Sequence, residues 1–138
     1  VFPADHPWQI LDVKKFGRPY GAGDCAGFLI DTPDVRMFIS GDTRLLPEHT
    51  ELTGVDVLGM DASACCFHLG VQGSAALCRY LSKAWLIPCH YGTYDAPGDP
   101  AHGGNPSDAL KLVEDADKRL IDAAPGEQIT FRSHRRIV

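Results

Sequence analysis

Apolar residues recur along the chain in short runs separated by polar and turn-forming residues, a pattern typical of β-strands. The predicted strands cover residues 10–13, 27–30, 35–40, 55–60, 84–88 and 128–132. Asp31-Thr32-Pro33-Asp34 lies between two of these runs. Proline and aspartate favour tight turns, so we predict a β-hairpin over residues 27–40.

Two later segments repeat their apolar residues with helical spacing, over residues 72–83 and 106–121. Asn105 suits the cap of the second helix and Pro106 suits its first turn. Strands come first along the chain, and strands and helices then alternate without an internal repeat. This order predicts an α/β fold in a single domain, residues 1–138. The Gly- and Pro-rich stretch 91–105 is predicted to be a loop that lines a site.

Composition narrows the class of protein. A chain of 138 residues with 44% hydrophobic and 22% charged residues can form one folded core, which excludes a disordered chain. No apolar run approaches the roughly 20 residues that span a bilayer. Acidic residues outnumber basic ones by 18 to 13, which argues against nucleic-acid binding as the main function. We therefore expect a small-molecule substrate, with neither nucleic acid nor membrane as partner.

The five cysteines are an odd number and show no Cys-x-x-Cys spacing. Disulfide frameworks occur in oxidising compartments and need paired cysteines. We therefore predict reduced thiols in a cytoplasmic protein.

Three apolar runs end in the same way, with a side chain that can bind a metal. His6, Asp42 and His90 each follow such a run directly. Strand ends are rigid, and side chains from several strand ends can converge on one point. We expect these three side chains to meet in space, although they are far apart along the chain.

The motifs around these residues resemble the metallo-β-lactamase superfamily, and most closely its lactonase-like hydrolases. The resemblance rests on Pro3-Ala4-Asp5-His6, on Ser40-Gly41-Asp42-Thr43, on the apolar run 55–58 and on Ile87-Pro88-Cys89-His90-Tyr91-Gly92-Thr93. It implies half of an αβ/βα sandwich, a mixed β-sheet with helices on one face. It also implies two metal ions (zinc, manganese or iron). His6 would bind the first ion, Asp42 would bridge both, and His90 would bind the second.

One motif of that superfamily, His-x-His-x-Asp-His, is missing. The six histidines stand at positions 6, 49, 68, 90, 102 and 134, and no two are separated by a single residue. The resemblance therefore implies a C-terminal half, completed by an N-terminal half or by a second copy of the chain. Stable zinc sites use three or four protein ligands, so we expect little hydrolase activity from the chain alone. The alternative is a non-catalytic half-fold module that associates with a partner chain or with itself.

In the completed fold, the resemblance implies that a metal-activated hydroxide attacks an ester, lactone or phosphoester. His68 is a candidate catalytic residue facing the substrate, or else a loop residue with a local hydrogen bond. Asp61 either supports a metal ligand or caps the following turn. Tyr91 and Thr93 could orient His90 or the substrate.

The remaining three histidines are given no catalytic role. Two possible nucleophile motifs are also rejected. His49 and His102 are predicted to be exposed, and His134 belongs to a short basic tail. Cys89 and His90 are adjacent on a strand, so their side chains point to opposite faces and cannot share a proton. Gly70-Val71-Gln72-Gly73-Ser74 does not have the spacing of a serine nucleophile elbow.

Overall fold

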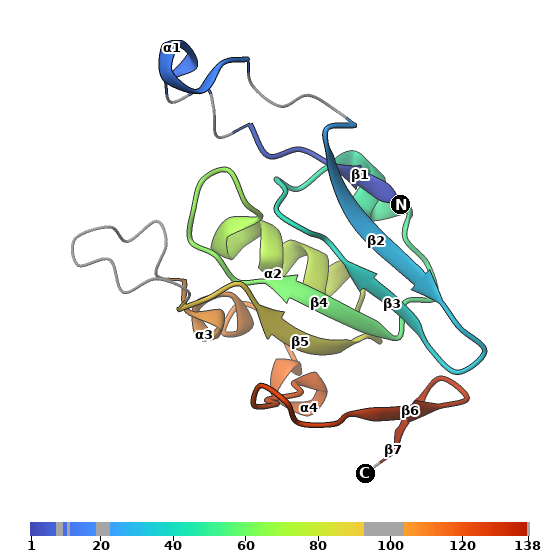
Figure 1. Ribbon diagram of the computed structural model, residues 1–138. Helices are drawn as coiled ribbons and strands as arrows, with labels where there is room; N and C mark the ends of the chain where they lie inside the picture. The colour runs from blue at the N-terminus through green and yellow to red at the C-terminus, as the bar shows by residue number, and fades with distance from the viewer. Residues whose placement is uncertain (8–9, 11, 19–22, 93–103, 138) are drawn as a thin grey trace.

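A five-stranded mixed β-sheet forms the centre of the molecule (Figure 1). The computed structural model describes residues 1–7, 10, 12–18, 23–92 and 104–137. In order across the sheet, the strands are β1 (Phe2–Ala4), β2 (Cys25–Asp31), β3 (Arg36–Ile39), β4 (Val57–Asp61) and β5 (Trp85–Cys89). β2 runs antiparallel to both β1 and β3, whereas β3, β4 and β5 are parallel. The predicted α/β class and the hairpin are confirmed.

The helices lie mainly on one side of this sheet. Behind the sheet in Figure 1 are α2 (Gly70–Tyr80) and the 3₁₀ helix η2 (Pro47–Glu51). α3 (Pro106–Leu110) packs against α2, and α4 (Ala116–Arg119) contacts β5. Within the described residues, no helix is long and apolar enough to cross a bilayer.

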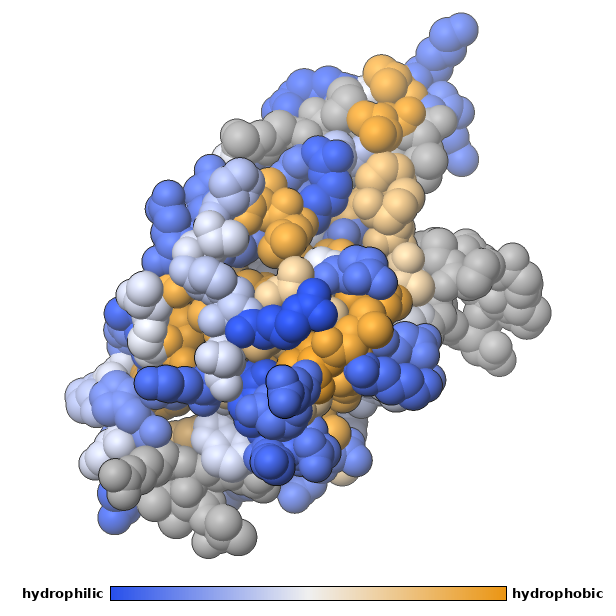
Figure 2. All heavy atoms as spheres, turned by 180° about the vertical axis from the view of Figure 1, so that it is seen from behind, coloured by the Kyte–Doolittle hydropathy of each residue, from blue (hydrophilic) through white to orange (hydrophobic). Residues whose placement is uncertain are grey.

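Three smaller elements lie outside this sheet-and-helix unit. The short helix α1 (Val13–Phe16) precedes β2, and β6 (Thr130–Arg132) pairs with β7 (Arg135–Ile137) in a separate antiparallel ribbon. Figure 2 shows the molecule from behind, where hydrophilic side chains and apolar stretches share the surface.

The core lies between the sheet and α2. Phe38, Leu58 and Leu86 are neighbours in register on β3, β4 and β5, and each is completely buried. Leu77 and Cys78 of α2 are buried in the same cluster. Full burial of one such large apolar side chain contributes about 1.5–3 kcal/mol, so this face of the sheet is the main source of stability.

The opposite face of the sheet is largely apolar: it is exposed at β2, partly buried at β3 and β5, and fully buried at Val57 of β4. Its residues alternate with those of the core, and the register pairs Phe28 with Ile39 and Ile30 with Met37. Phe28 and Ile30 are 49% and 43% exposed. We call these four residues, together with Trp85 and Ile87 of β5, the open sheet face.

Two of the predicted elements are wrong in detail. Of the predicted strand 10–13, the described residues 10, 12 and 13 are not extended in a sheet, because the Asp12 carboxylate accepts a hydrogen bond from Lys15 N and starts α1 instead; residue 11 lies outside the described residues. The predicted helix over residues 106–121 is broken into α3 and α4. Asp115 has a positive φ of 61°, a left-handed conformation that a right-handed helix cannot continue through. The cap is confirmed, since the Asn105 side chain accepts a hydrogen bond from Ser107 N.

The prediction that His49 is exposed is also wrong. The side chain is fully buried and stacks on the Phe2 ring, with 5.7 Å between ring centroids. Leu46 N donates a hydrogen bond to His49 Nδ1. Burial lowers the pKa of His49, because an apolar environment disfavours the imidazolium form. The sequence alone did not reveal this, because only the tertiary contacts place η2 beneath β1.

His134, assigned to a basic tail, is exposed but has a partner. Its Nδ1 lies 2.6 Å from Asp56 Oδ2, and Ser133 N donates to Asp34 Oδ1. The turn between β6 and β7 is therefore held against the main sheet. His102 lies outside the described residues.

We expect the buried imidazole of His49 to make stability depend on pH. Its pKa is lowered in the folded chain, so below the unfolded value of about 6.5 the unfolded chain binds more protons. The free energy of unfolding should therefore fall as the pH drops through 6.5, by at most about 1.4 kcal/mol per pH unit for this group. Urea unfolding of wild type and His49→Gln, at several pH values between 5 and 7.5, measures the difference. Gln keeps an acceptor for Leu46 N but does not titrate, so parallel pH profiles would contradict the prediction.

Candidate metal centre

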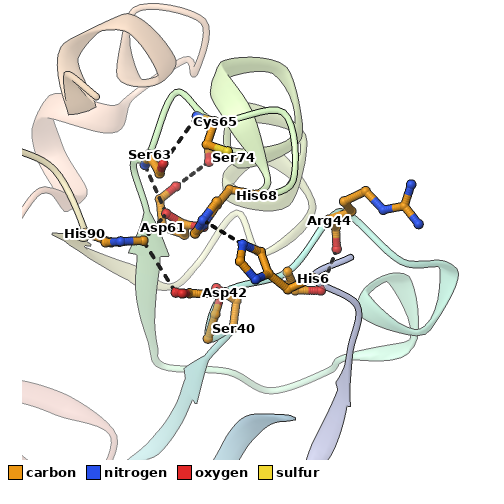
Figure 3. A network of polar contacts seen from close by, with 12 residues as sticks. His6, Ser40, Asp42, Arg44, Asp61, Ser63, Cys65, His68, Ser74 and His90 are labelled. Atoms are coloured by element: carbon orange, nitrogen blue, oxygen red, sulfur yellow. Dashed lines mark hydrogen bonds and ion pairs between the residues drawn. The ribbon is translucent and has the colours of Figure 1, made fainter. Parts of the chain in front are cut away.

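Five side chains of metal-binding type meet at one edge of the sheet (Figure 3). His6 follows β1, Asp42 follows β3, Asp61 ends β4 and His90 follows β5. His68 comes from the loop between β4 and α2. Because β2 is antiparallel to both of its neighbours, β1 runs in the same direction as β3, β4 and β5. The carboxyl ends of these four strands therefore share one edge, and this brings distant residues together.

Asp61 and His68 form the buried part of this centre. Their side chains are only 3% and 6% exposed, and His68 Nδ1 lies 2.8 Å from Asp61 Oδ2. A carboxylate only accepts hydrogen bonds, so His68 donates from Nδ1 and keeps a lone pair on Nε2 when neutral. That nitrogen faces the centre, 3.1 Å from His6 Nε2. A carboxylate that orients an imidazole in this way is typical of metal sites.

The surroundings of His6 favour its neutral form. Its pKa is lowered mainly by burial and next by the nearby His68, while Asp42 and Asp61 act in the opposite direction. A histidine must be neutral to bind a metal through its lone pair. The surroundings of His6 therefore suit a ligand.

His90 lies between two carboxylates. Its Nδ1 is 3.4 Å from Asp42 Oδ1 and 3.4 Å from Asp61 Oδ1. The Asp42 side chain is 57% exposed and that of His90 is 34% exposed, so this side of the centre faces solvent. The His90 backbone has a positive φ of 56°. Non-glycine residues rarely adopt this conformation, and it clusters at functional sites.

Gly41 fixes the position of Asp42. It has a positive φ of 64°, and a Cβ there would come within 2.6 Å of the Ala26 carbonyl oxygen. A larger residue would push β3 away from β2 at the point where Asp42 leaves the strand. The close approach of the Ala26 carbonyl oxygen therefore explains why position 41 is a glycine.

A second contact joins the chain segments that carry His6 and Asp42. Asp5 N donates to Thr43 Oγ1 at 2.9 Å, and Arg44 N donates to the Asp5 carbonyl oxygen at 2.9 Å. The Arg44 guanidinium also pairs with the Asp5 carboxylate. The residue before His6 is thus tied to the residues after Asp42. The sequence showed no signal for this contact, because the partners are 38 and 39 positions apart.

The donor atoms fit a metal ion. Two sets of three side chains, His6–Asp42–His68 and Asp61–His68–His90, each bring their ligand atoms within 4.8 Å of one another. Ligand atoms at about 2.0–2.2 Å from a shared ion lie roughly 3–4.4 Å apart. Imidazole nitrogen and carboxylate oxygen suit zinc, manganese or iron. His68 belongs to both sets, so the two sets are neighbours within one cluster.

The structure brings together the three residues named as ligands, the candidate His68 and Asp61. Asp61 contacts the His68 ring through Oδ2. It also caps the following turn, because its Oδ1 accepts a hydrogen bond from Ser63 N. Tyr91 is 43% exposed, and Thr93 lies outside the described residues. Cys89 donates its thiol to the Met60 carbonyl oxygen, and burial raises its pKa to about 11. This argues against a Cys89–His90 nucleophile.

Comparison with known proteins identifies relatives of one kind, although no family model matches the chain. A UPF0173 metal-dependent hydrolase of Solibacter usitatus is 26% identical over 137 residues, 93% of this chain and 54% of that protein. A protein of the same description from Archaeoglobus fulgidus is 26% identical over 136 residues, 95% of this chain and 55% of that protein. The chain therefore spans about half the length of the curated relatives it matches.

A solved structure has a similar fold. It is Igni18, described as a novel metallo hydrolase from the hyperthermophilic archaeon Ignicoccus hospitalis. The TM-score is 0.60 at 21% sequence identity, over 91% of this chain and 48% of that one. The five-stranded mixed sheet with its helices is thus consistent with half of a metallo-hydrolase fold. The relatives, described as metal-dependent hydrolases, support a metallo-hydrolase superfamily, and the solved structure supports the fold.

Proposed function

We propose that the chain is the metal-binding part of a metal-dependent hydrolase, with His6, Asp42 and His90 as metal ligands. The observation that carries the proposal is the convergence of four strand ends and one loop on a single cluster of imidazoles and carboxylates. The descriptions of the relatives support the same class of reaction. In this proposal His6 serves one ion, His90 serves a second, and Asp42 bridges both.

The chain's own residues supply positioning and proton transfer. A bound metal would provide a hydroxide at neutral pH and stabilise the negative charge that develops on an ester, lactone or phosphoester. Asp61 holds the His68 ring through Nδ1, so that Nε2 is directed at the centre. From there His68 can take up a proton from the attacking group or return one to the leaving group. Within this class, the lactonase-like branch, a small-molecule substrate and a cytoplasmic location remain predictions.

We further propose that the missing half of the fold covers the open sheet face. Phe28 and Ile30 are about half exposed on a face whose other members are also apolar, and the relatives are about twice as long as this chain. Burial of apolar surface contributes about 25 cal/mol per Å², which favours a second sheet packed over this one. The open face also supports the alternative function, a non-catalytic association module.

Zinc binding tests the ligand assignment. In isothermal titration we expect wild type to bind zinc weakly and Asp42→Asn to bind it at least about tenfold more weakly, because a shared ligand is lost. Asp117→Asn, an exposed change on α4, is the matched control and should bind like wild type. Equal affinities for all three proteins would contradict the ligand role and favour the association module.

Light scattering tests the proposal for the open sheet face. At tens of micromolar we expect wild type to form dimers or to bind a separately produced N-terminal half, and Ile30→Glu to prevent both. A charge on a face that is buried in the complex costs several kcal/mol unless it is paired. The control is Leu112→Glu, which adds the same charge at a residue 40% exposed outside the sheet. A wild type that stays monomeric and ignores the N-terminal half would refute this proposal.

A further inference from the structure

Two adjacent thiols stand in the loop that leads from β4 to α2. Cys66 is exposed and Cys65 is partly buried, and all five cysteines of the chain are free thiols. The pKa of Cys65 is raised, mainly by burial, and the interaction with the Cys66 side chain is among the further causes. The two thiols are carried by adjacent residues of one turn, in which His68 N bonds to the Cys65 carbonyl oxygen, and the Cys66 side of that turn is open to solvent. We call them the Cys65–Cys66 pair.

The pair belongs to a hydrogen-bonded turn between Asp61 and His68. Ser63 N donates to Asp61 Oδ1 at 2.9 Å, and Cys65 N donates to Ser63 Oγ at 3.2 Å (Figure 3). His68 N then donates to the Cys65 carbonyl oxygen at 3.1 Å. A change in the backbone at Cys65 and Cys66 would therefore reach His68 directly.

The other three cysteines lack a neighbouring thiol in sequence, and two of them are engaged in the interior. The Cys78 thiol is buried and donates to Met60 Sδ, and Cys89 donates to the Met60 carbonyl oxygen. Cys25 stands alone on β2, near the N-terminal end of that strand. The Cys65–Cys66 pair thus offers two thiols to one external atom.

We infer that the Cys65–Cys66 pair captures trivalent organic arsenic compounds, and that capture moves His68 away from Asp61 and His6. Soft thiol ligands favour soft, thiophilic atoms. A trivalent arsenic that carries one organic group and two hydroxyls forms one As–S bond with each cysteine. Each thiol gives its proton to a departing hydroxyl, so two water molecules leave. The arsenic stays trivalent throughout, and the step requires no oxidant.

Both the affinity and the effect on His68 follow from the position of the pair. Once one thiol has reacted, the second is held beside the arsenic, and such linked binding exceeds single-site binding by about 10²–10⁴-fold. The ring that results includes the Cys65–Cys66 peptide and restricts its dihedral angles. The turn that places His68 then has to adjust, which lengthens its contacts with Asp61 and His6. The inference does not depend on the proposed hydrolase function, because it concerns thiols that bind no metal in that proposal.

Phenylarsine oxide, which is hydrated to the required form in water, is the probe. We expect wild type to bind one equivalent per chain by mass spectrometry, in an adduct that survives millimolar β-mercaptoethanol and is released by the dithiol 2,3-dimercaptopropanol. Cys66→Ser, a change at an exposed position, should weaken binding at least about a hundredfold. Cys25→Ser is the matched control and should bind like wild type.

The histidine ring signals in NMR spectra test the coupling to His68. The His68 signal, assigned by its loss in His68→Gln, should shift in wild type when the adduct forms, while the His134 signal stays in place. Dimercaptopropanol should restore the original spectrum, which shows that the protein is still folded. Equal binding by wild type and Cys66→Ser, or no adduct that resists the monothiol, would overturn the capture site. An adduct that leaves the His68 signal unmoved would overturn the coupling.

Discussion

The common direction of β1, β3, β4 and β5 is the constraint on which the candidate site depends. Side chains at the carboxyl ends of these strands come from four distant parts of the chain, yet all lie along one sheet edge. The buried row Phe38, Leu58 and Leu86 holds the strands in register. Because the hydrophobic core fixes that register, the candidate ligands at the strand ends need no loop motion to approach one another.

The candidate site has a rigid buried side and a solvent-facing side. Burial of a charge is costly unless the charge is paired and hydrogen-bonded, and Asp61 meets that condition through His68 and Ser63 N. Asp42 and His90 remain partly exposed, so this side of the candidate site is accessible from solvent. A metal site needs both features: buried contacts that hold the side chains in place, and an exposed side through which an ion can enter. The strained φ of His90 lies on the accessible side.

The two faces of the sheet also differ in exposure, as the two sides of the candidate site do. One face is covered by α2 and η2, and the opposite face presents Phe28 and Ile30 to water. The chain aligns with about half of the Igni18 structure, and the matched relatives are about twice as long as the chain. The apolar sheet face and the candidate metal centre therefore lie in a chain whose fold matches about half of a longer metallo-hydrolase structure.

Local patterns in the sequence were enough to predict most strands, helix α2, the cap at Asn105 and the set His6, Asp42 and His90. These features depend on neighbours along the chain: alternation, helical spacing and residues that end a strand. Tertiary contacts alone decided that His49 is buried, that Asp115 breaks the last helical segment and that Asp5 is tied to Thr43 and Arg44. Such features depend on residues far away in sequence, whose effect on burial and backbone conformation no local pattern records.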